Sequence, residues 1–209
     1  MTQYTQRVCE SILPLSVADT LPEAFKEWSF TEEIVDHEEA IETCYLCGQE
    51  NIRYHFKIKN QYTNHKLWVG SHCILRFDVA VFDDGQQLSV EDAKKKLDKL
   101  TEKMQLDSCI RALQRLAKAE DNVILTSALE YYQKNKKLTP KFAFVVFWRL
   151  SENGVAHNPS FFKINLRKKK YRKDLAEMPA SRVRYFWSAL TTSQRQIALD
   201  LGHSPPPNI

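Results

Sequence analysis

CYLCG at residues 44–48 and VGSHC at residues 69–73 are the two motifs from which the architecture of this chain can be worked out. Cys44 and Cys47 lie two residues apart, so they can place two sulfurs on one small cation, while the glycine that follows lets the chain turn back sharply. Cys73 adds a third sulfur just after a second glycine, where a helix is expected to begin. Because thiolate and imidazole donors in a tetrahedral set select zinc over magnesium or calcium, the two motifs predict a structural Zn²⁺ site.

The segment between the motifs predicts a β-hairpin. From residue 52 to residue 59, apolar side chains at every second position alternate with basic or polar ones, which is the pattern of a half-buried strand. Residues 60–64 are rich in turn formers, and residues 66–69 form a short return strand. A helix then starts at Gly70-Ser71, with Ser71 as its expected N-cap, and runs to about Asp78. We call the Cys-x-x-Cys-Gly turn at residues 44–48 the knuckle. A knuckle, a hairpin and a helix in this order predict a treble-clef zinc fold.

This part of the chain resembles a small treble-clef zinc module of uncharacterised phage and mobile-element proteins. The resemblance lies in residues 44–48, Ile58-Lys59-Asn60, Thr63 and residues 67–73. The resemblance covers about residues 40–80. Related sequences often carry a second cysteine at the position of Ser71, so the resemblance does not supply a four-cysteine site here. Such modules are commonly nucleic-acid-binding or protein-binding elements, and they do not by themselves imply catalysis.

The fourth zinc ligand is open among several candidates. His72 is our first choice, although it neighbours Cys73 and adjacent helical residues point apart. His65, in the hairpin turn, is the alternative because it can reach across. More distant candidates are His37, His55 and Cys9; His55 alternates with the apolar face of its strand and is expected to face solvent.

Charge is distributed very unevenly along the chain. Residues 1–47 hold two basic and ten acidic side chains, whereas residues 134–209 hold fifteen basic and four acidic ones. The cations are densest in one predicted nucleic-acid-binding segment, which consists of Arg167, Lys168, Lys169, Lys170, Tyr171, Arg172 and Lys173. Lysines and arginines can neutralise phosphates while the tyrosine ring stacks on an unpaired base. The plainer alternative is a solvated helical face. Further cations that can extend this surface are Lys134, Lys136, Lys137, Lys141, Arg182 and Arg184.

The remaining sequence reads as helical, which gives an α+β, mostly α fold with a helical bundle after the zinc module. We expect an acidic N-terminal helical segment at 1–39, the zinc module at 40–84, a basic helical domain at 85–203 and a disordered tail at 204–209. A break is expected near Asp107. The apolar run at 142–148 lies between a helix start at Thr139-Pro140 and a stop at Asn153-Gly154, so we interpret it as a core helix. Cys109 is interpreted as a buried thiol.

Several functional classes are disfavoured. The sequence contains no phosphate-cradling glycine loop, no serine or cysteine nucleophile motif and no zinc-deaminase signature of His-x-Glu followed by Pro-Cys-x-x-Cys, so we expect a protein that is not an enzyme. No apolar run reaches the ~18 residues of a membrane span, and five cysteines without a disulfide-framework spacing favour a reducing compartment, so we expect a cytoplasmic protein. The first hypothesis is a zinc-stabilised protein that binds DNA or RNA through its basic C-terminal half. The alternative is an adaptor or inhibitor of a host protein complex, and a metal-dependent nuclease ranks third.

Overall fold

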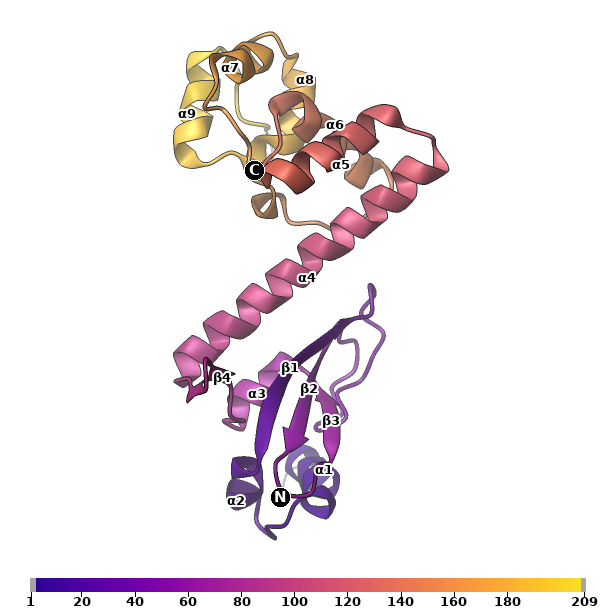
Figure 1. Cartoon of the computed structure of the whole chain (residues 1–209), viewed down its shortest axis with the longest axis vertical. Coiled ribbons are helices and arrows are strands. Elements are labelled where there is room, and N and C mark those ends of the chain that lie inside the picture. The colour runs from indigo at the N-terminus through magenta and orange to yellow at the C-terminus, as the bar shows by residue number, and fades with distance from the viewer. Residues whose placement is uncertain (1–2, 208–209) are drawn as a thin grey trace. The chain divides into compact units, whose positions relative to one another are not determined.

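The computed structural model describes residues 3–207 and has an α+β fold that is mostly helical, with a small three-stranded sheet (Figure 1). The chain divides into two compact units, residues 1–104 and residues 105–209. Helix α4, Val90–Ala119, contains the boundary between them and runs without the break that was predicted near Asp107. The residues predicted as an acidic segment, 1–39, and as a zinc module, 40–84, both fall into the first unit.

The first unit starts with short helical elements, as the sequence predicted. These are α1 (Gln3–Ile12), the 3-10 turn η1 (Leu13–Leu15) and α2 (Leu21–Lys26). Pro22 lies in the first turn of α2, where a missing backbone N–H costs nothing. The amphipathic α1 buries Val8 and Ile12 against the rest of the unit.

The sheet is antiparallel, with the order β1-β2-β3. Strands β2 (Tyr54–Asn60) and β3 (Lys66–Val69) confirm the predicted hairpin. Strand β1 (Trp28–Asp36) corrects the prediction, which assigned these residues to a helical segment. A bulge between Phe30 and Ile34 interrupts the alternation of β1, and Glu32 adopts a left-handed conformation there with φ 66°. A strand interrupted in this way does not show period two in the sequence.

Helix α3 (Ser71–Arg76) follows the hairpin and places Cys73 and Ile74 in the core. Its N-cap is Gly70, so Ser71 is the first helical residue and not the predicted cap. The core of this unit joins the sheet, α1, α3 and the start of α4. Its buried members are Val8, Ile12, Phe25, Trp28, Phe30, Cys44, Leu46, Phe56, Ile58, Val69, Cys73, Ile74, Val79, Val81, Ala93 and Leu97.

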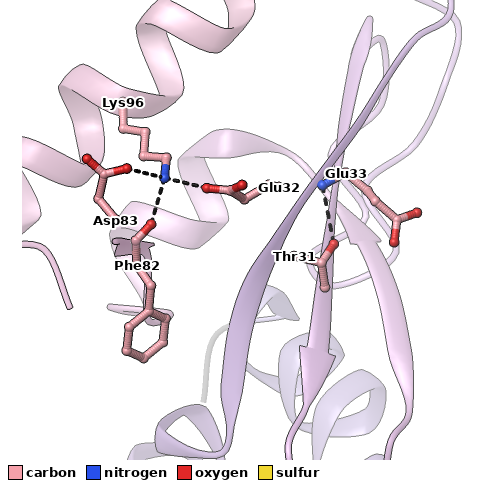
Figure 2. A network of polar contacts seen from close by, with 6 residues as sticks. All are labelled: Thr31, Glu32, Glu33, Phe82, Asp83 and Lys96. Carbon is pink, nitrogen blue, oxygen red and sulfur yellow. Dashed lines mark hydrogen bonds and ion pairs between the residues drawn. The ribbon is translucent and has the colours of Figure 1, made fainter. Parts of the chain in front are cut away.

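The first turns of α4 are held to this unit by Lys96 (Figure 2). The ammonium group donates to the Phe82 carbonyl oxygen at 2.6 Å, to the Asp83 carboxylate at 2.9 Å and to the Glu32 carboxylate. Phe82 and Asp83 form β4, which pairs with β5 (Gln86–Gln87) in a small hairpin. Glu32 comes from the β1 bulge, so one lysine links three segments of the unit.

The second unit is helical. Its elements are α5 (Val123–Asn135), α6 (Pro140–Glu152), η2 (Pro159–Phe161), α7 (Lys169–Ala176), α8 (Ala180–Val183), η3 (Arg184–Ala189) and α9 (Thr192–Asp200). Asn122 and Thr139 cap α5 and α6 through their side chains, and α6 is the predicted core helix. Phe147, Phe162 and Phe186 are among the largest fully buried side chains at the centre of the unit.

The predicted tail lies partly outside the described residues. Residues 204–207 form no helix or strand, and residues 208 and 209 lie beyond the described part of the chain.

Candidate metal centre and basic cleft

The predicted knuckle is a tight, hydrogen-bonded turn. The Gly48 N–H donates to the Cys44 carbonyl oxygen at 2.8 Å, and the Cys44 N–H donates to the Gln49 carbonyl oxygen at 2.9 Å. Gly48 has φ +75°, a conformation that L side chains rarely adopt, and a Cβ there would lie 2.4 Å from the Arg7 guanidinium. The Tyr45 N–H donates to the Trp68 carbonyl oxygen at 3.0 Å, which fixes the knuckle to β3. The turn therefore presents its cysteines in a defined place beside the hairpin.

Three cysteine sulfurs meet at this point. The Sγ atoms of Cys44, Cys47 and Cys73 all lie within 4.8 Å of one another, and those of Cys44 and Cys73 are 3.7 Å apart. Cys44 and Cys73 are buried, and Cys47 is half-buried. Within residues 3–207 these three residues are the one group of His, Cys, Asp and Glu close enough to hold a metal ion. The three cysteines that the sequence predicted as ligands are thus brought together.

The surroundings of Cys44 favour a thiolate. The Cys73 thiol donates to its sulfur, and this lowers the pKa of Cys44 to about 5 against the opposing effect of burial, with help from the backbone N–H groups of Cys47, Gly70 and Leu46. The Gly70 nitrogen lies 3.4 Å from that sulfur. The pKa of Cys73 is raised because its thiol donates to the Cys44 thiolate and because it is buried. Metal ligation requires deprotonated thiols, so a cation between the sulfurs would take the place of the shared proton.

A cavity of about 510 Å³ opens beside the sulfurs. It is lined by Tyr4, Cys44, Cys47, Gln49, Ile52, Gly70, His72, Cys73 and Arg76. The Tyr4 hydroxyl is buried beside Cys73 and forms no hydrogen bond of regular geometry with any described residue. A buried polar atom of this kind calls for a partner such as an ion or water, so it fits a site built to hold one. Tyr4 lies about forty positions from the knuckle, and no sequence motif connects it with the cysteines.

The histidines predicted as fourth ligands stand apart from the sulfur group. His72 is exposed and lines the cavity, but it is not one of the residues whose donor atoms come together. His65 is exposed, and its Nδ1 lies 3.4 Å from the Leu15 carbonyl oxygen. Cys9 is half-buried on α1 and is likewise outside the group.

His55 does not face solvent as predicted. It is 3 % exposed, and its two ring nitrogens lie 3.0 Å from the Thr43 carbonyl oxygen and 3.1 Å from His37 Nε2. The rings of Tyr45 and Trp68 pack near it, which is why a position on the polar face of the strand becomes buried.

The predicted basic segment lies at the start of α7. Its six cations are all exposed, whereas Tyr171 is half-buried and packs against the core of the second unit. The Tyr171 hydroxyl lies 3.0 Å from the Tyr131 hydroxyl, so this ring takes part in packing within the unit. Lys173 lies 3.7 Å from Glu177, while Arg172 donates through Nε to the Leu166 carbonyl oxygen at 3.0 Å.

Two members of this segment border a cleft of about 400 Å³. The cleft has four cationic side chains, contributed by Lys137, Lys163, Arg167 and Arg172, and no carboxylate. None of the four forms an ion pair with another residue in the described range, in contrast to Lys141, which pairs with Asp174. The other lining residues are Ser160, Phe162, Ile164, Asn165, Leu166, Ala189, Thr191, Gln194 and Ile197. Lys163 has no cationic neighbour in the sequence, so only folding reveals its place here.

A second cationic feature of this unit combines arginines with aromatic rings. Phe144 stacks on Trp148 at 5.9 Å between ring centroids and meets Tyr185 edge-on at 5.8 Å. The Arg182 guanidinium lies 5.0 Å from the centre of the Phe144 ring, and that of Arg184 lies 5.3 Å from the centre of the Tyr185 ring. All three rings are half-buried, so part of each remains at the surface.

Comparison with known proteins gave no match to any family model, curated protein or solved structure. Among the described helices, none is both long and apolar enough to cross a membrane.

Proposed function

We propose that this chain is a zinc-stabilised nucleic-acid-binding protein, in which a treble-clef module organises the first unit and the second unit contacts phosphates. The observation that carries the proposal is the cleft lined by Lys137, Lys163, Arg167 and Arg172 without a carboxylate. Four positive charges around one concavity repel one another, and an anion in the cleft would offset that repulsion.

The choice of zinc rests on the donor set. Three sulfurs within 4.8 Å of one another match the soft ligands that zinc prefers. Knuckle, hairpin and helix follow one another as in a treble clef, and the cysteines come from the knuckle and from the first turn of α3. In this role the metal is a folding device, because its binding free energy adds to that of a small core.

The choice of nucleic acid rests on the combination of charge and aromatic surface. Cations at the cleft can follow a sugar–phosphate backbone, and half-buried rings with arginines beside them suit the stacking of unpaired bases. The second unit as a whole carries 18 basic and 8 acidic side chains, which adds a long-range attraction for any polyanion.

Fluorescence anisotropy with single-stranded and duplex DNA and RNA tests the proposal. We expect the double variant Lys163→Glu, Arg167→Glu to bind at least about tenfold more weakly, and the slope of log affinity against log salt to fall by roughly 1.5 to 2. The matched control is Arg111→Glu, Lys118→Glu, which makes the same charge change at exposed positions of the same unit away from the cleft. Equal losses in both variants, or no binding by the parent protein at low salt, would contradict a role for the cleft.

One observation favours the adaptor or inhibitor as a second candidate. Ile41 is 68 % exposed and Tyr45 is 52 % exposed, and the chain just before Ile41 carries the exposed Glu38 and Glu39. Exposed apolar side chains that form a patch rimmed by polar residues mark protein-binding surfaces. Affinity capture from a host lysate after nuclease treatment tests this candidate: a partner that is retained by the parent protein and lost with Ile41→Ser supports it, and loss of every partner after nuclease counts against it.

A further inference from the structure

The proposed zinc site has three sulfur ligands and lacks an evident fourth. Structural zinc sites are almost always four-coordinate and closed, whereas sites that exchange a ligand keep one position open. Within the described residues, the group that can hold the metal contains Cys44, Cys47 and Cys73 and no further His, Cys, Asp or Glu. The 510 Å³ cavity lies on the same sulfurs, so a small molecule has room to approach them.

Tyr4 brings a hydroxyl to this cavity. The oxygen is buried beside the sulfurs of Cys73 and Cys47, and although Cys73 is close enough to interact with it, no hydrogen bond of regular geometry joins the two. The ring is held in place, because the Arg76 guanidinium lies 4.2 Å from its centre and the Phe77 ring stacks on it at 6.3 Å. A hydroxyl fixed beside the sulfurs can donate or accept one hydrogen bond with a group bound among them.

The charge balance at the metal narrows the choice of that group. Three thiolates already outweigh the two positive charges of Zn²⁺, so a further anionic ligand adds repulsion, a cost that four-cysteine zinc sites accept because the chain itself supplies the fourth thiolate. A neutral donor, such as water or an imidazole nitrogen, avoids this cost.

We propose that the zinc ion keeps an exchangeable fourth position facing this cavity, that a small neutral oxygen or nitrogen donor fills it, and that the Tyr4 hydroxyl hydrogen-bonds this donor. Tyr4 is thus a positioning residue and not a metal ligand. The inference rests on the proposed zinc site. It makes the centre one that can receive a donor from outside the chain.

Cobalt substitution of the full-length protein tests the proposal, with imidazole as the probe. Sulfur-to-cobalt charge-transfer absorption reports the number of thiolates, and the visible d–d bands report the fourth ligand. We expect three thiolates and a saturable change in the d–d bands on adding imidazole. His72→Ala should give the same starting spectrum and the same titration as the parent. Tyr4→Phe should keep the metal stoichiometry and the charge-transfer band but weaken imidazole binding about fivefold. Tyr45→Phe, at an exposed tyrosine in the knuckle, is the control. It should leave the metal stoichiometry, the charge-transfer band and the imidazole affinity unchanged.

The outcomes separate the two levels of the proposal. Failure to bind either Co²⁺ or Zn²⁺ overturns the proposed zinc site itself. Metal binding with d–d bands that do not respond to imidazole overturns the open position, and so does a changed starting spectrum in His72→Ala, because His72 would then be the fourth ligand. Unchanged imidazole affinity in Tyr4→Phe overturns the role of the hydroxyl.

Discussion

The two units of this chain differ in both charge and construction. The first holds 12 basic and 18 acidic side chains, and the second holds 18 basic and 8 acidic ones. The core of the first has 16 buried residues, two of which are the candidate ligands Cys44 and Cys73, whereas the core of the second has 23 buried residues, with Cys109 as its one cysteine. Two units of nearly equal length thus differ in the number of residues in their cores and in the place of cysteine within them.

The difference bears on the zinc site that we propose for the first unit. Its sheet has strands of nine, seven and four residues, and three sulfurs converge beside it. A metal bound there would add its binding free energy to the stability of the first unit, whereas the helical core of the second unit relies on close packing. The two units should therefore respond to different perturbations.

The largest contrast is expected from loss of the metal. Cys44→Ser should abolish stoichiometric zinc binding and lower the free energy of unfolding of the first unit by roughly 5 kcal/mol or more, so that this unit unfolds. The second unit should keep its own unfolding transition. Metal analysis and amide NMR of the full-length protein measure both effects. Cys9→Ser, outside the sulfur group, is the control. Unchanged metal content and melting in Cys44→Ser would refute the zinc site.

The reciprocal perturbation is Phe147→Ala. Phe147 is fully buried and meets Phe162 edge-on at 5.4 Å between ring centroids. Truncation leaves a cavity and should lower the free energy of unfolding of the second unit by about 4 kcal/mol, without a change in the zinc content of the protein. Chemical denaturation with parallel metal analysis checks this. Phe144→Ala, at a half-buried position on the same helix, should cost less. If the Phe147→Ala variant also lost its zinc, the two units would not respond separately.

A smaller effect, confined to the first unit, is expected at Glu27. This carboxylate is 6 % exposed and accepts from Asn60 Nδ2 at 2.6 Å and from the N–H groups of Val17 and Ala18 at 2.9 Å and 2.7 Å. Burial acts to raise its pKa, but these hydrogen bonds outweigh burial and hold the pKa below its ordinary value of 4.5. Glu27→Gln should destabilise the unit by about 2 kcal/mol at pH 7, because the amide group then faces a hydrogen-bond donor.

The pH dependence of this contribution has a definite sign. Because the folded-state pKa of Glu27 is depressed, its contribution is complete above the unfolded value of 4.5 and is lost as the pH falls through the folded value. Denaturation from pH 7 downward should therefore show the parent and Glu27→Gln converging in acid. A difference in stability that stays constant over this range would contradict the assignment.

The smallest effect is expected at Lys96. Its three acceptors satisfy all three ammonium protons, but the side chain is 18 % exposed and its carboxylate partners face water, so Lys96→Met should cost about 1 kcal/mol. Thermal melting of the first unit measures this, with Lys99→Met at an exposed position of α4 as the control. Equal effects in both variants would mean that the contacts in Figure 2 contribute little.

Local patterns made much of the first unit predictable. The Cys-x-x-Cys-Gly turn, the alternation at 52–59 and the return strand depend on residues close in sequence, and the structure contains each of them. Helix α6 was predicted for the same reason, since Thr139 caps it through a bond to the Phe142 N–H. Strand β1 escaped prediction because its bulge disrupts period two and because glutamates occupy its centre.

The features that define the two candidate sites depend on distant segments. Tyr4 reaches the sulfurs from α1, and Lys163 reaches the cleft from the loop after α6, so neither belongs to a sequence motif. His55 lies on the polar side of its strand by alternation, yet Tyr45 and Trp68 enclose it once the knuckle folds back. The spacing of residues in the sequence does not predict such contacts, because they arise only when separate elements pack.

The bulge in β1 also bears on how the molecule behaves at high concentration. An outer strand with free N–H and carbonyl groups is a template for a strand of another molecule, and such pairing starts aggregation. Here Ala80 occupies the first part of the β1 edge, through bonds to Trp28 and Phe30. Beyond it the bulge at Glu32 interrupts the regular edge, and Glu33 adds another charge. The strand that sequence patterns miss is thus expected to be a poor template for a strand of another molecule.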